Sequence, residues 1–161
     1  MSTGDMFLRV EAARTGTIRG ESSDEAHRDE IVVHGWSWAM HSPGTASGPT
    51  GRATFDSLRI IKRVDAASTA LLSAMRHNEN LKEIVLSVRK PGPEPVDYLV
   101  VTGELGRISD IEFQTGEDPD DPLVERLTLT LGRITVQYTL QDADGRPGTT
   151  TSFTADVRGI A

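Results

Sequence analysis

A change in the alternation of apolar residues near Gly132 constrains the fold more than any other feature of the sequence. Apolar residues occupy the odd positions of 127–131 and the even positions of 134–140. Because strand side chains alternate between two faces, one extra residue moves every later side chain to the opposite face. We predict a bulge or sharp bend at Gly132 and Arg133, or a tight break between two strands. Such bends allow a sheet to curl into a barrel.

Period-two alternation or a continuous apolar run recurs along the chain and predicts about eight strands. The segments are 6–10, 31–38, 55–64, 84–88, 98–101, 107–113, 127–140 and 153–157. The first has one apolar face, whereas 98–101 is apolar on both faces and is predicted to be central, or covered by the helix or another subunit. The turn signals between the segments are typical of an antiparallel sandwich or a closed barrel.

Residues 66–77 carry the helical period. Leu71, Leu72 and Met75 lie at i, i+1 and i+4, and Asp65 or Ser68 can cap the start. A helix this short needs a sheet against its apolar stripe. The predicted fold class is therefore mainly β, an antiparallel two-sheet β-barrel or sandwich with one short α-helix. With 161 residues, we expect a single domain, 1–161.

A long loop is predicted over residues 39–51. Its sequence, AMHSPGTASGPTG, contains three glycines and two prolines and has no periodicity. Loops longer than ~12 residues are uncommon in compact domains unless they are functional or disordered. An ordered contact arm and a flexible hairpin tip are both compatible with this segment.

Charge and composition argue against several classes of function. A net charge of −7 disfavours general affinity for nucleic acid or anionic membranes, and the absence of cysteine removes disulfides and thiolate metal sites. The start, MSTGDMFLRV, lacks the features of a secretory signal, and no apolar run approaches the ~20 residues of a membrane span. We therefore expect synthesis in the cytoplasm without a signal peptide and no membrane insertion.

The sequence shows no catalytic, cofactor or metal constellation. Nucleophile-elbow and phosphate-loop motifs are absent, and the four histidines have no ligand spacing. Asp142-Ala-Asp-Gly145 matches the opening of a calcium loop without its later ligands, so a hairpin turn is preferred. The carboxylates of 21–30 are interpreted as capping groups of a tight turn. We predict no enzymatic activity and no cofactor.

The stretch 20–38 resembles a known family. The run Gly20-Glu21-Ser22-Ser23-Asp24-Glu25-Ala26-His27 precedes a strand that ends in Trp36-Ser37-Trp38. This order resembles the hemolysin-coregulated protein family, the tail-tube subunit of bacterial type VI secretion. The motif turn consists of Gly20, Glu21, Ser22, Asp24 and His27. Further matching positions are Phe55, Leu58, Lys62, Asp65, Ser68, Arg89, Lys90, Ile108, Ser109, Glu125, Gly132, Arg133, Ile134 and Tyr138.

The resemblance implies a homohexameric ring. Stacked rings would form a hollow tube that a contractile sheath ejects together with spike proteins, and small effector proteins would travel in the lumen. The subunit would leave the cell through the type VI apparatus. The resemblance also implies that loop 39–51 contacts the next subunit or ring. The candidate contact residues are Met40, His41, Ser42, Pro43, Thr45, Ser47 and Pro49.

Two other functions remain open from the residues. A tail-tube protein of another phage-tail-like contractile injection system would share the barrel. A small-molecule or carbohydrate-binding barrel would use Trp36 and Trp38 as stacking platforms. Such a barrel predicts saturable quenching of tryptophan fluorescence by a ligand, whereas core tryptophans would not respond.

Overall fold

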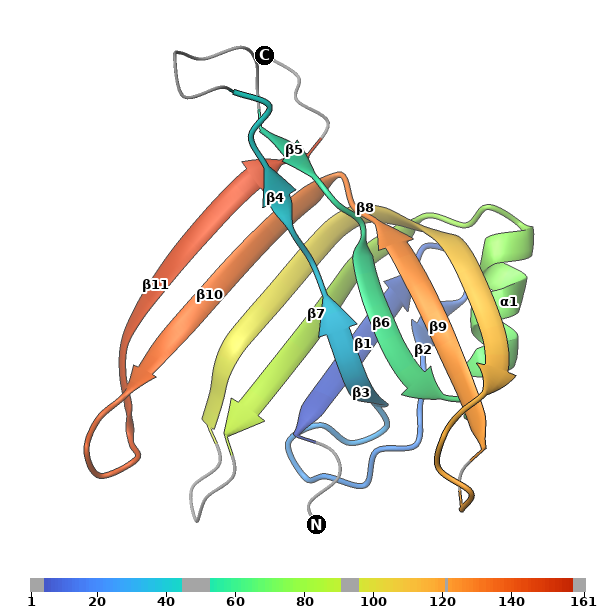
Figure 1. The fold of residues 1–161 in the computed structure, drawn as a ribbon, viewed down its shortest axis with the longest axis horizontal. Helices are drawn as coiled ribbons and strands as arrows, with labels where there is room; N and C mark the ends of the chain where they lie inside the picture. Colours follow the sequence, from blue (N-terminus) through green and yellow to red (C-terminus); the bar gives the residue numbers. More distant parts are fainter. Residues whose placement is uncertain (1–4, 45–52, 91–95, 121, 158–161) are drawn as a thin grey trace.

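The computed structural model describes residues 5–44, 53–90, 96–120 and 122–157 (Figure 1). Within these ranges the chain forms one helix and a series of antiparallel strands. In chain order they are β1 (Met6–Ala12), β2 (Gly16–Ile18), β3 (Ile31–Ser37), β4 (Met40–His41), β5 (Thr54–Phe55), β6 (Leu58–Arg63), α1 (Ser68–Arg76), β7 (Leu81–Lys90), β8 (Val96–Thr115), β9 (Leu123–Thr130), β10 (Arg133–Gln141) and β11 (Pro147–Asp156).

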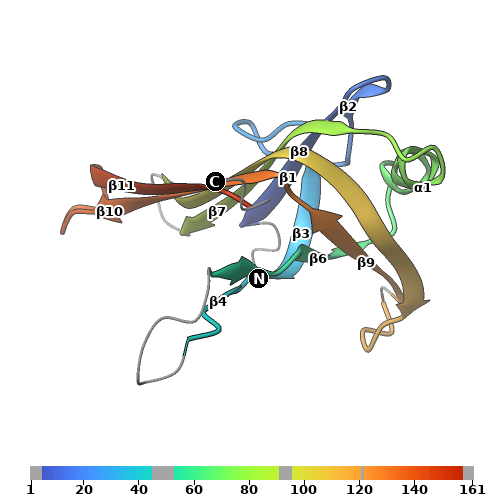
Figure 2. The same cartoon turned by 90° about the horizontal axis from the view of Figure 1, so that it is seen from above.

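Six strands close into an antiparallel barrel in the order β8-β7-β1-β3-β6-β9, and β9 pairs back onto β8. Strands β10 and β11 continue the sheet from β8 outside the barrel, and we call this pair the wing. Figures 1 and 2 show the wing extending to one side, with α1 on the other. The predicted class, an antiparallel β-barrel with one short helix, is confirmed.

Strand β8 is shared by the barrel and the wing. The sequence predicted separate strands at 98–101 and 107–113, but the structure joins them in one strand of 20 residues. Its first half pairs with β7 and β10, and its second half pairs with β9. The prediction that 98–101 is central is confirmed, because β7 and β10 pair with its two edges.

The change of alternation near Gly132 is a bend in two paired strands. Strand β9 ends at Thr130 and β10 begins at Arg133, so the tight break is the correct alternative. Opposite the break, Leu105 of β8 has a left-handed φ of 54°, and the Gly132 N–H donates to the carbonyls of Glu104 and Leu105. The pairing offset between β8 and its partner is the same directly before and after the break, and it shifts by one residue farther along β8, between Ile108 and Asp110. No residue is inserted at Gly132, because β8 and its partner bend together.

Leu131 fills the inside of this bend. A Cβ atom on Gly103 would lie 2.6 Å from Leu131 Cδ2 and 3.0 Å from Ile84 Cγ1, and one on Gly106 would lie 3.3 Å from Leu131 Cδ2. A side chain at either position would require Leu131 to shift, because Leu131 occupies the space above both glycines. Two glycines of β8 that the sequence analysis did not single out therefore make room for Leu131 at the bend.

The barrel interior is aliphatic. Its fully buried members include Leu8, Leu58, Ile60, Ile84, Leu86, Leu127 and Leu129. Helix α1 buries Leu71 and Ala74, whereas Leu72 of the predicted stripe is 41% exposed. Helix α1, the one helix in the described ranges, is not long and apolar enough to cross a membrane.

Three sequence predictions need local correction. Strand β1 was predicted to bury one face, but Phe7 on its other face is buried too, because residues 20–30 lie over Phe7. Residues 16–18, which lie outside the eight predicted strands, form β2 on β1. The predicted loop 39–51 begins as an arm in which β4 pairs with β5, so the predicted strand 55–64 is split; residues 45–52 lie outside the described ranges.

We expect Gly103→Val to lower the free energy of unfolding by about 1–3 kcal/mol, because the new side chain overlaps Leu131. Adding Leu131→Ala should recover part of this loss, which urea unfolding at fixed protein concentration would measure. Gly35→Ala is the control, since its Cβ would meet Ile61 at an ordinary 3.5 Å. Equal stability of Gly103→Val and the wild type would contradict the packing described for the bend.

Candidate functional site

The motif turn lies in a segment without regular secondary structure, residues 20–30, which we call the strap. Backbone hydrogen bonds close it on itself, from Gly20 N to Asp29 O (2.7 Å), Ser22 N to Glu30 O (3.0 Å) and Asp29 N to Ser22 O (2.9 Å). A Cβ atom on Gly20 would lie 2.6 Å from the Glu30 carbonyl oxygen. Glycine is therefore required where the two ends of the strap meet.

Glu21 and Ser22 use their side chains as acceptors for backbone N–H groups. Glu21 Oε2 accepts from Ala66 N (2.6 Å), just before α1, and Ser22 Oγ accepts from Asp24 N (3.2 Å). Asp24 Oδ1 in turn accepts from Ala26 N (3.0 Å). Glu21 thus fastens the strap to the segment that enters the helix.

Asp24 fastens the strap to β7. Its Oδ2 atom lies 2.7 Å from Arg89 Nη2, and the Arg89 guanidinium lies over the Phe7 ring, 5.0 Å from its centroid. The hydrogen bond from Arg89 holds the pKa of Asp24 below its usual value, and the same contact raises the pKa of Arg89. Both side chains are largely removed from solvent, with 25% and 13% of their surface exposed.

His27 fastens the strap to β8. Its ring is stacked on Phe7 with centroids 4.4 Å apart, Nδ1 lies 3.0 Å from Glu30 Oε1, and Nε2 lies 3.0 Å from both carboxylate oxygens of Asp97. Both ring nitrogens can donate at once only when the imidazole carries two protons. Asp97 precedes a register shift between β7 and β8, and such irregularities re-aim neighbouring side chains.

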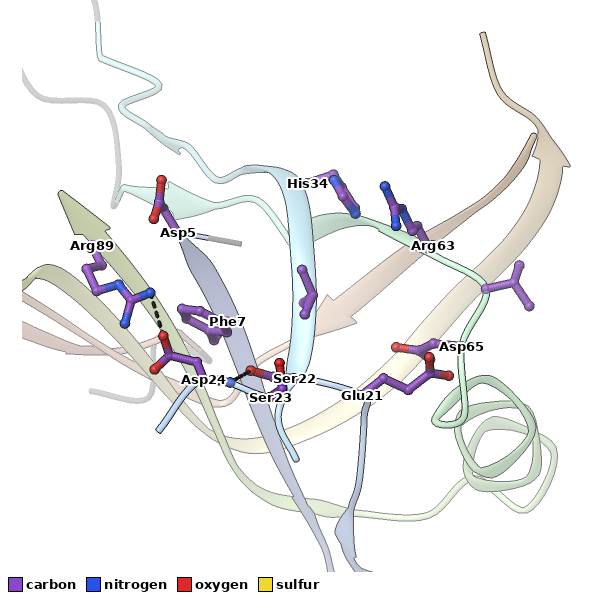
Figure 3. A pocket seen from close by; sticks show the side chains of 12 residues that line it. Asp5, Phe7, Glu21, Ser22, Ser23, Asp24, His34, Arg63, Asp65 and Arg89 are labelled. Carbon is purple, nitrogen blue, oxygen red and sulfur yellow. Dashed lines mark hydrogen bonds and ion pairs between the residues drawn. The ribbon is translucent and has the colours of Figure 1, made fainter. Parts of the chain in front are cut away.

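A cleft of 420 Å³ opens between the strap and the ends of β1, β3 and β6 (Figure 3). Arg63, Arg89 and His34 line it together with four acids, Asp5, Glu21, Asp24 and Asp65. Among the described residues, no group of three or more histidine and acidic side chains is placed to hold a metal ion. The contacts of Glu21, Asp24 and Arg89 hold the strap on the barrel.

A second polar cluster lies inside the barrel near the start of α1. The Lys62 ammonium donates to Glu125 Oε1 (2.8 Å) and Asp65 Oδ1 (2.9 Å), and Ser68 Oγ donates to Glu125 Oε1 (2.6 Å). The Lys62 and Glu125 side chains are 0% exposed and face each other across β6 and β9. Within the described part of the chain, Glu125 Oε2 is buried without a hydrogen bond. The ion pair therefore links two barrel strands to the helix.

The sequence analysis named these four residues without inferring that they meet. The alternation of the two strands did indicate the contact. Lys62 lies on the same face of β6 as the buried positions 58 and 60, and Glu125 lies on the same face of β9 as the buried positions 127 and 129. A lysine and a glutamate on the inner faces of two strands predict a buried ion pair once those strands are paired.

Glu79 is a further residue that the sequence analysis missed. It follows Asn78, whose φ of 52° ends the helix, and its Oε2 accepts from Arg14 N and Thr15 N, both at 2.7 Å. These N–H groups, the Thr15 backbone bond above all, lower the pKa of Glu79. The side chain joins the end of α1 to the β1–β2 turn.

The remaining predicted residues lie apart from the strap. Met40 and His41 form β4, where Met40 is 48% exposed and His41 Nε2 lies 3.1 Å from Asp56 Oδ2. Ser42 and Pro43 follow as exposed residues, whereas Thr45, Ser47 and Pro49 lie outside the described ranges. Gly132 and Arg133 stand at the bend. The structure does not bring these residues together with the motif turn.

The two tryptophans are partly buried against the core. Trp38 also stacks on Phe55, with ring centroids 6.2 Å apart. Both rings therefore contribute to packing, and Trp36 also lines a cleft of about 260 Å³ together with residues of β6 and β9.

Together, the fold and the strap define a class of small antiparallel β-barrels with one helix, an arm and a side wing. Solved structures of this class align over nearly the whole chain. A type six secretion system protein aligns with a TM-score of 0.83 and 21% identity over 95% of this chain and 96% of its own. Hcp1 from Salmonella typhimurium gives 0.76 and 21% over 97% of both chains. A type VI secretion system effector from Yersinia pestis gives 0.74 and 22% over 94% of this chain and 99% of its own.

The family follows from the sequence matches. Residues 7–138 match the family model described as type VI secretion system effector, Hcp. Protein hcp1 of Pseudomonas aeruginosa is 32% identical over 146 residues, which cover 88% of this chain and 86% of the relative. The chain belongs to the Hcp family of type VI secretion system proteins, which confirms the resemblance carried by the motif turn.

We expect Lys62→Met to cost about 3–5 kcal/mol in the free energy of unfolding, because it leaves the buried Glu125 carboxylate without its cation. The double variant Lys62→Met/Glu125→Leu should recover most of that loss, as measured by urea unfolding. Arg59→Met, on the exposed face of the same strand, is the control and should change stability little. A single Lys62→Met variant as stable as the wild type would show that the pair does not hold the barrel.

The lowered pKa of Asp24 predicts how the stability of the protein changes at low pH. A carboxylate whose pKa is lowered by folding contributes stability above its unfolded pKa and loses it as pH falls through the folded value. Asp24→Asn should therefore cost about 1 kcal/mol at pH 7, and its difference from the wild type should shrink below about pH 4. Thermal unfolding from pH 7 to pH 2 measures this, with the exposed Glu25→Gln as control. A constant difference at every pH would refute the role of the Asp24 charge.

Proposed function

We propose that this chain is a structural subunit of a type VI secretion tube. Copies form a hexameric ring, rings stack into a hollow tube, and a contractile sheath expels the tube with its spike proteins and with small effector proteins in the lumen. Family membership supports this proposal, as does the similarity to proteins named as type VI secretion components and effectors.

The observation that carries the proposal is the uncovered apolar face of the wing. Along β10, Ile134 is fully buried, whereas Tyr138 is 39% and Leu140 54% exposed, and Phe153 of the neighbouring β11 is 43% exposed. The apolar surface of the barrel core thus continues onto a ribbon that nothing in the described ranges covers. Contiguous exposed apolar surface of this kind marks a site of protein association.

The free edge of β11 supports the same proposal. All but one of its ten residues are exposed, and it pairs only with β10 among the described strands. Long uncovered edge strands promote association with other chains, and natural monomers usually protect them with charges or bulges. In β11 the only charged residue is Asp156, at the end of the strand.

The proposal assigns no reaction to the subunit. Asp24, Arg89 and His27 of the strap are already engaged in ion pairs and hydrogen bonds that fasten it to the barrel. The subunit acts through its shape and through its contacts with other copies.

The arm supports a role in ring stacking. In Figure 1 the arm formed by β4 and β5 leaves one end of the barrel, and β1 begins at the other end. An arm that projects beyond the barrel along its strands can reach a copy in the next ring. We therefore keep Met40, His41, Ser42, Pro43, Thr45, Ser47 and Pro49 as the proposed contact residues.

The direct test of the proposed function is the size of the purified protein, combined with export. Sedimentation and negative-stain images should show closed rings of six copies. A tagged copy should reach the medium of a type VI-competent bacterium only when the sheath is intact. A protein that remains monomeric at high concentration and is not exported would overturn the proposal.

We further expect deletion of Ser42 to Pro49 to leave rings intact while reducing the length of stacked tubes, because the deletion shortens only the arm. Electron micrographs of tubes assembled at equal concentrations measure the effect. The Glu25→Gln variant, at an exposed position of the strap, serves as the comparison for non-specific loss. Tubes of unchanged length would show that the arm has no role in stacking.

A further inference from the structure

The seam between β1 and β3 has the shortest pairing in the closed barrel. Within the described ranges, these two strands pair only at Phe7 with Val32 and at Leu8 with Ile31. The opposite edge of β1 pairs with β7 along the whole strand. Strand β3 cannot extend the seam, because β2 occupies the same edge of β1 from Val10 onward. Backbone hydrogen bonds therefore secure the barrel less at this seam than at its other seams.

The strap leaves the sheet beside this seam. It begins after β2 and returns to the start of β3, and the bond from Gly20 N to Asp29 O (2.7 Å) closes its base. From there it folds over the outer face of β1, where the His27 ring stacks on Phe7 with centroids 4.4 Å apart. Phe7 is 2% exposed, and its cover on this face comes from the strap and from the Arg89 guanidinium. The strap thus lies directly over the seam.

The strap is fastened on both sides of the seam. In the barrel order β8-β7-β1-β3-β6-β9, Asp24 binds Arg89 of β7 (2.7 Å), and His27 binds β8 on the same side. On the other side, Glu21 Oε2 accepts from Ala66 N (2.6 Å), in the segment that follows β6. Figure 3 shows Asp24 directed toward Arg89, and Glu21 directed the opposite way, toward the segment that enters α1. The fasteners therefore bridge the seam from beyond β1 to beyond β3.

The other seams of the barrel have longer pairing. Strands β6 and β9 pair from Leu58 to Arg63, and the buried Lys62–Glu125 ion pair ties them together. Strand β8 pairs with β7 and β9 over most of its length, and β3 pairs with β6 at four positions. The strap supplies at the β1–β3 seam the closure that the short pairing does not.

We infer that the strap acts as a clasp, which holds the barrel closed at the β1–β3 seam, and that the barrel opens first at this seam when the strap is released. An open seam would expose Leu8 and Ile31, both 0% exposed in the closed barrel, together with two unpaired strand edges. Such edges pair readily with other chains, so the clasp also protects the subunit from non-specific association. The inference concerns a single subunit and does not depend on the proposed ring.

Native-state hydrogen exchange of the full chain, at urea concentrations below the unfolding transition, tests the clasp. In the wild type, the amides of Leu8 and of residues 31–33 should exchange through a local opening with little dependence on urea. This opening should require less free energy than the opening that exposes the amides of β6 and β9. Seam amides that exchange only together with those of β6 and β9 would overturn the inference, whether or not any variant folds.

Two variants weaken the clasp, one on each side of the seam. Asp24→Asn and Glu21→Ala should each speed the local exchange of the seam amides by about fivefold to tenfold. Glu25→Gln, at an exposed position of the strap, is the matched control and should exchange like the wild type.

Gly103→Val distinguishes a clasp from a general contribution to stability. Its clash with Leu131 is present whether the seam is closed or open, so it should lower global stability without speeding the local exchange of the seam. Clasp variants that leave the seam amides unchanged, or a Gly103→Val variant that speeds them as much as the clasp variants do, would overturn the inference.

Discussion

The packing of Leu131 against the backbone of Gly103 and Gly106 is the contact on which the rest of the structure depends. It allows β8 to bend while staying paired, so that one strand serves the barrel with its second half and the wing with its first. Because the bend transfers the inner face of the barrel onto the wing, the apolar surface does not end where the core ends. The uncovered wing face is thus a consequence of the bend, and the proposed contact with a neighbouring copy rests on this face.

Polar contacts then fix the elements around this bent sheet. The strap is fastened at three points, by Glu21 to the entry of α1, by Asp24 to β7 and by His27 to β8. Inside the barrel, the Lys62–Glu125 pair faces across β6 and β9, and a buried pair of this kind favours one strand register over others even where it adds little stability. These ties hold both ends of the helix and the barrel wall in place, which a subunit requires if it is to present the same surfaces to every neighbour.

Local patterns in the sequence predicted much of the fold. Period-two alternation indicated the antiparallel barrel, the parity change indicated the break before Arg133, and the motif turn indicated the family. What the sequence could not show are the contacts between residues far apart in the chain: Lys62 with Glu125 is separated by 63 positions and His27 with Asp97 by 70. The burial of Phe7 was missed for the same reason, since its cover comes from the strap. Likewise, β8 was predicted as two strands because its exposed bend at Leu105 interrupts the alternation that marks a single one.

Amide hydrogen exchange at two protein concentrations tests the central claim, that the wing extends from a closed barrel and is covered only by a second copy. Below the association range, amides along the free edge of β11 should exchange fast while the strands of the closed barrel stay protected. Above it, protection of β10 and β11 should rise by about tenfold or more, which corresponds to about 1.4 kcal/mol, with the barrel strands unchanged. Protection of the wing that is already complete in the dilute monomer, or that never changes with concentration, would contradict the account.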